Sequence, residues 1–201
     1  MNISWYGQRC VRIECREGSV LADPFDPKDT GLRGPVINDD LVLLSAYDQP
    51  AALLERIGEG PFLVRGPGEY ERKGIAVRGI PAFQDSQSGR ELGLATIYRV
   101  TAEDVTVCCL GALGQDKLTD EQLEDIGDPD ILVIPPGTQS ALDAKALAAV
   151  VTAIEPKVVL ALGSYDAFIK QLGLAPQKTD TYRIQKKSLP VDQTVLVVLT
   201  S

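Results

Sequence analysis

Residues 2–25 read NISWYGQRCVRIECREGSVLADPF. Three short segments within this stretch, residues 3–6, 11–15 and 19–22, are rich in apolar residues and are separated by turns that contain Gly7 and Gly18. Short apolar runs bounded by glycine are typical of strands that are joined by tight connections. The stretch therefore predicts that the chain begins as a β-sheet.

The rest of the chain alternates between strand and helix patterns. We expect further strands at residues 41–44, 62–64, 75–80, 94–100, 105–110, 158–162 and 194–200. Residues 66–71 are rich in glycine but lack the lysine and the Ser or Thr of a phosphate-binding loop, so we expect a tight turn there. Residues 176–189 are expected to form a surface excursion. The short connections predict one α/β domain over residues 1–201, without a linker or a repeat.

Four helices are expected from their capping residues. The first spans about residues 49–57, with Asp48 as its N-cap and Gly58 at its end. Thr119 and Gln122 form a capping-box pattern ahead of a helix that ends near residue 127. Ser140 and Asp143 repeat this pattern before a helix that runs to about residue 154. The last helix covers about residues 165–172 and stops at a glycine.

Composition excludes several classes of function. Hydrophobic residues make up 44% of the 201 residues, enough for a full domain with a large core. The formal net charge of -8 would repel a phosphate backbone, so we expect no nucleic-acid partner. The longest apolar run, residues 146–154, is too short for a membrane span. We therefore expect a cytoplasmic protein without a membrane anchor.

The chain contains no histidine. Histidine is the commonest protein ligand of transition metals and the usual general base near neutral pH. Catalysis by a Ser-His or Cys-His pair is therefore excluded. The four cysteines lack the paired C-x-x-C spacing of a zinc site, and we interpret them as reduced thiols that pack in the core; they are Cys10, Cys15, Cys108 and Cys109.

Five motifs occur in the order and at roughly the spacing of one known family. They are residues 5–10 (WYGQRC), 23–25 (DPF), 66–71 (GPGEYE), 110–114 (LGALG) and 142–145 (LDAK). Together they resemble the small zinc-dependent hydrolases of the metallo-β-lactamase superfamily, the group that includes ascorbate-6-phosphate lactonase-like proteins. The resemblance extends from about residue 2 to residue 165. It implies a metallo-β-lactamase-like α/β fold, a four-layer αββα sandwich.

The positions that hold metal in that family have changed in this chain. The family's H-x-H-x-D-H run corresponds to residues 46–51, AYDQPA, and only Asp48 of its four ligand positions can donate strongly to a metal. A zinc hydrolase needs three protein ligands and an open position. The resemblance therefore implies a degenerate site at eight positions: Gln8, Ala46, Asp48, Pro50, Ala51, Gln84, Ala112 and Gly163.

Some side chains near these positions have two interpretations. Asp48 is either a surviving metal-binding or proton-transferring carboxylate or a helix N-cap, and we favour the cap. Gln8 and Gln84 either contact a ligand or fill space beside backbone groups. Tyr165 is a further candidate ligand contact. Cys109 alternates with Cys108 along its strand, so one of the two thiols is expected to point toward the former site.

We expect a metal-free, cofactor-free and non-catalytic protein, a pseudoenzyme that acts as a homo-oligomer or as the partner of another protein. One alternative is a hydrolase with an altered metal or none, which would use Asp23, Asp48, Asp85 and Cys109. A second alternative is a sensor that binds a small molecule in the emptied site. Because a large polar void is costly, we expect neighbours such as Tyr47, Gln84 and Tyr165 to fill part of that site.

Overall fold

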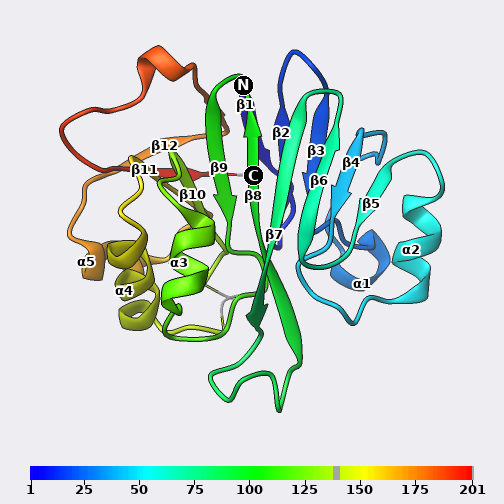
Figure 1. Cartoon of the computed structure of the whole chain (residues 1–201), viewed down its shortest axis with the longest axis horizontal. Coiled ribbons are helices and arrows are strands. Elements are labelled where there is room, and N and C mark those ends of the chain that lie inside the picture. Colours follow the sequence, from blue (N-terminus) through cyan, green and yellow to red (C-terminus); the bar gives the residue numbers. More distant parts are fainter. Residues whose placement is uncertain (138–140, 201) are drawn as a thin grey trace.

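In the computed structural model, which describes residues 1–137 and 141–200, two β-sheets lie face to face between two groups of helices (Figure 1). The first sheet has the strand order β13-β1-β2-β3-β4-β5. Its strands are β1 (Asn2–Trp5), β2 (Val11–Glu14), β3 (Ser19–Ala22), β4 (Leu41–Leu43), β5 (Phe62–Val64) and β13 (Thr181–Arg183). Strands β3, β4 and β5 are parallel, whereas β13, β1, β2 and β3 pair antiparallel.

The second sheet has the order β12-β14-β11-β10-β9-β8-β7-β6. Its strands are β6 (Gly68–Arg72), β7 (Ile75–Phe83), β8 (Leu94–Ala102), β9 (Val105–Cys109), β10 (Ile131–Ile134), β11 (Val158–Leu162), β12 (Pro176–Thr179) and β14 (Val195–Leu199). Strands β6 to β9 form an antiparallel meander, and the others pair in parallel. Strands β9, β10, β11 and β14 are apolar along nearly their whole length because both faces of this part of the sheet are covered, whereas the parallel edge strand β12 is polar.

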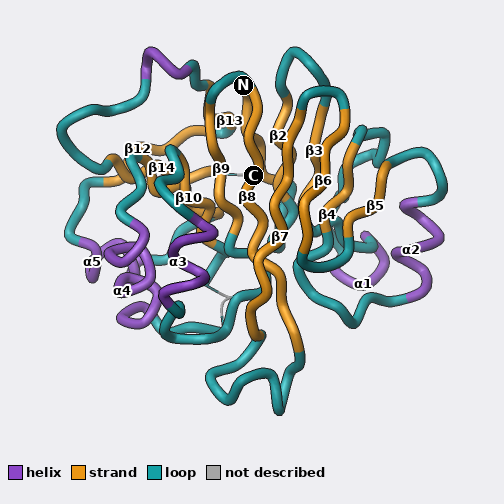
Figure 2. The backbone as a smooth tube through the Cα atoms, viewed as in Figure 1, coloured by secondary structure: helices purple, strands orange, loops and turns teal. Residues whose placement is uncertain are grey.

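Three apolar clusters hold the layers together. One fills the space between the sheets and includes Ile3, Tyr98 and Cys109. A second lies between the eight-stranded sheet and helices α3 (Asp120–Ile126), α4 (Ala144–Ile154) and α5 (Asp166–Leu172). A third lies between the six-stranded sheet and the segment that carries α1 (Pro27–Thr30) and α2 (Ala51–Ile57). With the helices on the two outer sides (Figure 2), these clusters confirm the expected four-layer αββα sandwich.

Most expected elements are found within two or three residues of their predicted bounds. Thr119 caps α3, and its capping box with Gln122 is present. Gly58 and Gly173 follow the last residues of α2 and α5. Cys108 and Cys109 point to opposite faces of β9, since each belongs to a different apolar cluster. The alternation of this strand is therefore as expected.

Two predicted helix starts are wrong. Helix α2 begins at Ala51 with Pro50 as its N-cap, so Asp48 does not cap it. A residue that precedes proline is disfavoured in the helical region, which keeps Gln49 outside the helix. Helix α4 begins at Ala144, and Asp143 itself is the N-cap: its side chain accepts a hydrogen bond from the Ala146 N–H. Ser140, the residue expected at that cap, lies outside the described residues.

Two segments predicted as loops contain strands. Residues 68–72 form β6, which pairs with β7 from Gly68↔Gly79 to Arg72↔Ile75, so residues 66–71 are not a tight turn. Residues 176–179 and 181–183 are edge strands, one in each sheet, rather than a free excursion. These strands are mostly exposed and polar and therefore lack the apolar alternation that marks a half-buried strand. The pairing of their backbones with strands distant in sequence determines their structure.

Candidate functional site

A buried hydrogen-bond network lies at the ends of β3, β4 and β9, next to some of the eight positions that the sequence resemblance singles out. The Ser45 N–H donates to Oδ1 of Asp23 at 2.7 Å, and the Ser45 hydroxyl donates to Oδ2 at 2.6 Å. The Ala112 N–H in turn donates to Oγ of Ser45 at 2.9 Å. Two of the eight positions therefore adjoin this network: Ala46 follows Ser45 in the chain, and the backbone N–H of Ala112 is part of it. Their methyl groups offer no donor to a metal.

A protein cation lies beside the buried carboxylate of this network. Nε of Arg9 is 3.9 Å from Oδ2 of Asp23, and Asp23 is only 9% exposed. Burial raises the pKa of Asp23 above its usual value, although Arg9 and the hydrogen bonds from Ser45 oppose that shift. Nε of Arg9 is buried and has no hydrogen-bond acceptor within the described part of the chain. The anion at this site is thus paired with an arginine.

A small cavity remains next to Arg9 and Asp23. Its volume is about 150 Å³, and Gln8, Gln49 and Pro50 contribute to its wall. The structure thus brings Gln8 and Pro50, two of the degenerate positions, to the same cavity as Asp23. Gln8 has a left-handed backbone (φ 51°) and accepts a hydrogen bond from the Trp5 indole N–H through its carbonyl oxygen, at 2.9 Å.

The indole of Trp5 closes the space beside Gly163, the position that the sequence resemblance matches to the family's last histidine. A Cβ at Gly163 would lie 2.8 Å from Cη2 of Trp5, closer than a van der Waals contact allows. The three side chains expected to fill the former site have other contacts. Tyr47 lies over Gly66 and is 39% exposed. Tyr165 lies over Gly137 and stacks on Phe168.

Gln84 and Asp85 line a separate surface depression of about 360 Å³, and their side chains hold the loop beside it. Nε2 of Gln84 donates to the carbonyl oxygens of Leu92 and Leu94. The Asp85 carboxylate accepts four backbone N–H groups, from Gln87, Gly89, Glu91 and Leu92. These hydrogen bonds lower the pKa of Asp85, and the one from the Leu92 N–H has the largest effect. Neither side chain shares the cavity of Gln8 and Asp23.

The residues present do not fit a zinc centre. In the part of the chain that the structure describes, no group of three or more Cys, Asp or Glu side chains is arranged to hold a metal ion. Asp48 and Ala51 are exposed, and they lie outside the lining of the cavity beside Asp23. An arginine beside Asp23 would also repel a divalent cation.

Three of the four cysteines are buried. Burial raises the pKa of Cys108 to about 12 and that of Cys109 well above its usual value. Burial likewise raises the pKa of Cys10. A thiolate is the reactive form of cysteine, so burial disfavours the reactive form of these three thiols. The burial of Cys109 therefore gives no support to its use as a reactive group in the hydrolase alternative.

The fold is an α/β sandwich of the metallo-β-lactamase type. Residues 2–162 match the family model described as the β-lactamase superfamily domain, and the chain belongs to this family. No curated protein sequence matches it significantly. Of the helices described, none is long and apolar enough to cross a membrane.

Several solved structures have the same fold. One is a candidate Zn-dependent hydrolase of the metallo-β-lactamase superfamily from Thermotoga maritima, with a TM-score of 0.75 and 23% identity over 98% of this chain and 97% of the other. A candidate metal-dependent hydrolase from Parabacteroides distasonis has a TM-score of 0.64 and 14% identity over 98% and 91%. The metallo-β-lactamase fold protein YhfI from Bacillus subtilis has a TM-score of 0.59 and 10% identity, over 99% of this chain and 96% of the other.

Proposed function

We propose that this chain is a metal-free and non-catalytic member of its family, a pseudoenzyme that acts by binding, either to copies of itself or to another protein. The solved structures of similar fold include candidate metal-dependent hydrolases, so the proposal is that this chain keeps their scaffold without their chemistry. It needs no cofactor.

The observation that carries the proposal is the pairing of Asp23 with Arg9. The two hydrogen bonds from Ser45 use both carboxylate oxygens of Asp23, and the Arg9 guanidinium supplies the opposite charge. A metal would have to displace this arginine and would find one carboxylate where a hydrolytic zinc needs three ligands. The buried ion pair thus takes the electrostatic place that a bound cation would occupy.

An activity screen tests this proposal. Esterase, lactonase and phosphodiesterase substrates are assayed with purified protein, with and without added zinc, manganese or iron. The expected result is no turnover above that of heat-denatured protein, both for the wild type and for Asp23→Asn. Saturable, metal-dependent turnover that Asp23→Asn abolishes would favour the alternative of an altered-metal hydrolase.

One observation favours a second candidate function, the binding of a small polar molecule. Nε of Arg9 is a buried donor without an acceptor among the described residues, and the cavity of about 150 Å³ lies beside it. Buried donors are normally satisfied, by protein groups, water or a ligand. A thermal-shift screen of small carboxylic acids, with Arg9→Leu as the matched control, tests this function. Stabilisation of the wild type alone would support it, and no stabilisation by any acid would remove it.

A further inference from the structure

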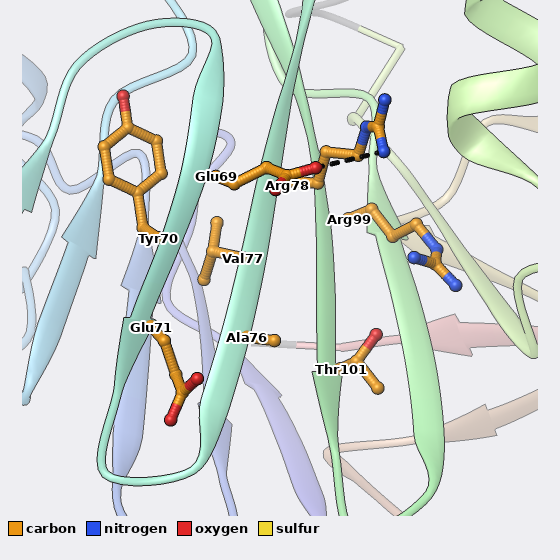
Figure 3. A pocket seen from close by; sticks show the side chains of 8 residues that line it. All are labelled: Glu69, Tyr70, Glu71, Ala76, Val77, Arg78, Arg99 and Thr101. Carbon is orange, nitrogen blue, oxygen red and sulfur yellow. Dashed lines mark hydrogen bonds and ion pairs between the residues drawn. The ribbon is translucent and has the colours of Figure 1, made fainter.

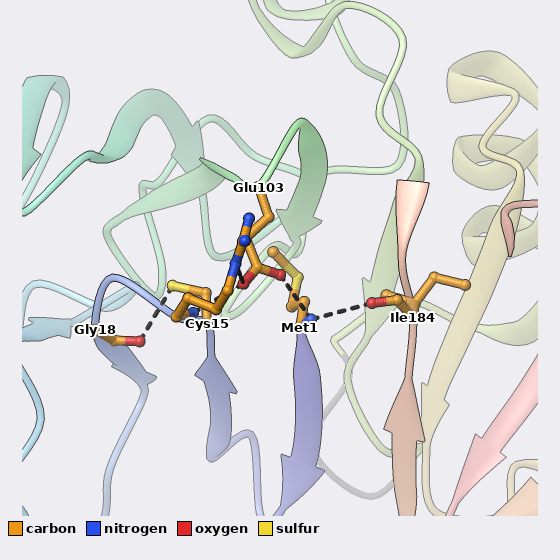
Figure 4. Close-up of polar contacts among 6 residues, drawn as sticks. Met1, Cys15, Gly18, Glu103 and Ile184 are labelled. Carbon is orange, nitrogen blue, oxygen red and sulfur yellow. Dashed lines mark hydrogen bonds and ion pairs between the residues drawn. The ribbon is translucent and has the colours of Figure 1, made fainter. Parts of the chain in front are cut away.

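The outer face of strands β6, β7 and β8 carries an ordered set of charges. The register places Glu69, Arg78 and Arg99 in one row across the three strands, because Glu69 pairs with Arg78 and Arg78 with Arg99. Side chains of paired residues lie on the same face of a sheet. The neighbouring row on this face consists of Glu71, Ala76 and Thr101. Figure 3 shows the charged groups around the small side chain of Ala76.

The two arginines of the first row differ in their partners. Arg78 forms ion pairs with Glu69 at 3.3 Å and with Asp125 of α3. Arg99 forms none with the described residues, and its buried Nε lacks an acceptor there. Glu71 is exposed and likewise has no ion pair within the described chain. One unmatched cation and one unmatched anion therefore share this face.

Glu71 and Arg99 cannot readily neutralise each other within one chain. They are on β6 and β8, with β7 between them, and strands two places apart in a sheet are about 10 Å apart. The two residues also occupy different rows. Between them lies a hollow of about 340 Å³, lined by Ala76 and Thr101 among others. The hollow leaves room for a side chain that comes from outside the chain.

We propose that this face is the interface of a two-fold symmetric dimer, in which Glu71 of each copy enters the hollow of the other and pairs with Arg99 there. A two-fold interface brings the same patch of both subunits together, so each contact occurs twice and the patch must complement itself. A face with one unmatched carboxylate and one unmatched guanidinium meets this requirement. The small side chain of Ala76 permits close approach near the symmetry axis.

This inference rests on the proposed binding role and names the surface that serves it. An acidic peptide could also pair with Arg99, but it would leave Glu71 facing a like charge, which is costly at an interface. A second copy satisfies both groups. An interface of standard size buries roughly 800 Å² on each partner, so residues around this face would also contact the other copy.

Charge reversal followed by analytical ultracentrifugation tests the dimer. The full chain is studied as wild type, Arg99→Glu, Glu71→Arg and the double variant, and Arg183→Glu on the exposed edge strand β13 is the matched control. We expect each single variant to weaken dimerisation at least about tenfold, because like charges then face each other twice. The double variant restores the exchanged pair and should recover dimerisation. Arg183→Glu should dimerise like the wild type.

Circular dichroism first shows that each variant is folded, and Arg99→Gln replaces Arg99→Glu if that variant is not. A wild type that stays monomeric at every concentration would overturn the dimer. The proposal would also be overturned if Arg183→Glu lost as much dimerisation as the single charge-reversal variants. It would be overturned as well if the double variant dimerised no more tightly than the single variants. None of these results depends on metal content or turnover. The dimer can therefore be disproved while the proposed absence of catalysis stands, and the reverse.

Discussion

The indole of Trp5 occupies the space into which a side chain at Gly163 would project. The Cβ of such a side chain would lie 2.8 Å from the ring, and Gly163 has a left-handed backbone with φ 73°. Trp5 ends β1 of one sheet, and Gly163 follows β11 of the other. The contact therefore links the two sheets at the position that the sequence resemblance matches to the family's last histidine.

The first prediction concerns Gly163→Ala, with Gly173→Ala as the matched control. Gly173 has nearly the same backbone (φ 71°) but open space where a Cβ would go. We expect Gly173→Ala to cost about 1 kcal/mol of unfolding free energy from backbone strain alone. Gly163→Ala should cost a further 1–3 kcal/mol or so, because it overpacks against Trp5. Urea denaturation measures both, and equal costs would show that Trp5 does not fill the site.

The second prediction concerns Asp85 and pH. Its lowered pKa means that the folded state favours the charged carboxylate. The stability that Asp85 contributes is therefore present above the usual carboxyl value of 3.8 and is lost as the pH falls through the lowered value. We expect Asp85→Ala to melt at a lower temperature than the wild type at pH 7. The difference in melting temperature between the two proteins should become smaller as the pH falls below 3.8. A difference that is the same at pH 7 and in acid would contradict the role given to the four hydrogen bonds from backbone N–H groups.

Hydrogen exchange gives that prediction a local readout. The amides of Gln87, Gly89, Glu91 and Leu92 should exchange faster in Asp85→Ala than in the wild type, because each donates to the lost carboxylate. The amides of the paired strands β10 and β11 are the internal control and should be unchanged. Unaltered exchange in residues 86–92 would mean that the loop does not depend on Asp85.

The third prediction concerns the thiols. Only Cys15 is partly exposed; Cys10, Cys108 and Cys109 are buried. Burial also raises the pKa of Cys15, so we expect it to react slowly. An aromatic disulfide reagent at pH 7.5 should modify one thiol in the folded protein and four after unfolding, and Cys15→Ser should remove the single reactive thiol. Rapid modification of a second thiol in the native state would contradict the inert role of the buried cysteines.

The fold could be predicted from the sequence because its signals are local. The apolar strands, the Thr119 capping box and the helix-ending glycines follow from short-range chemistry, and the five motifs specify their arrangement. The edge strands β12 and β13 have no such signal, since their residues are polar and exposed. Strand β10 is absent from the predicted strands, although its apolar run, ILVI, is a clear strand signal. The single-turn helix α1 also had a signal, in its Asp26 cap and Pro27.

The site was less predictable because its contacts join distant segments. That Ala46, Ala112 and Gly163 carry no side-chain donor can be read directly from the sequence. The pairing of Arg9 with Asp23 depends on the register of the neighbouring strands β2 and β3. The contact of Trp5 with Gly163 depends on how the two sheets meet. Asp23 was singled out only as a catalytic alternative, whereas the structure holds it with Ser45. A buried aspartate followed by Pro-Phe gave no indication of the cation beside it.

Metal content tests the central claim most directly. The protein is purified without chelators, its metals are measured by elemental analysis, and its melting temperature is followed as zinc is added. A metal that bound only the folded state would stabilise it by about 2.7 kcal/mol at a hundredfold excess over its dissociation constant, a shift on the order of 5–10 °C. We predict no stoichiometric zinc, manganese or iron and no such shift. About one metal per chain, with zinc-dependent turnover that Asp48→Ala abolishes, would contradict the account.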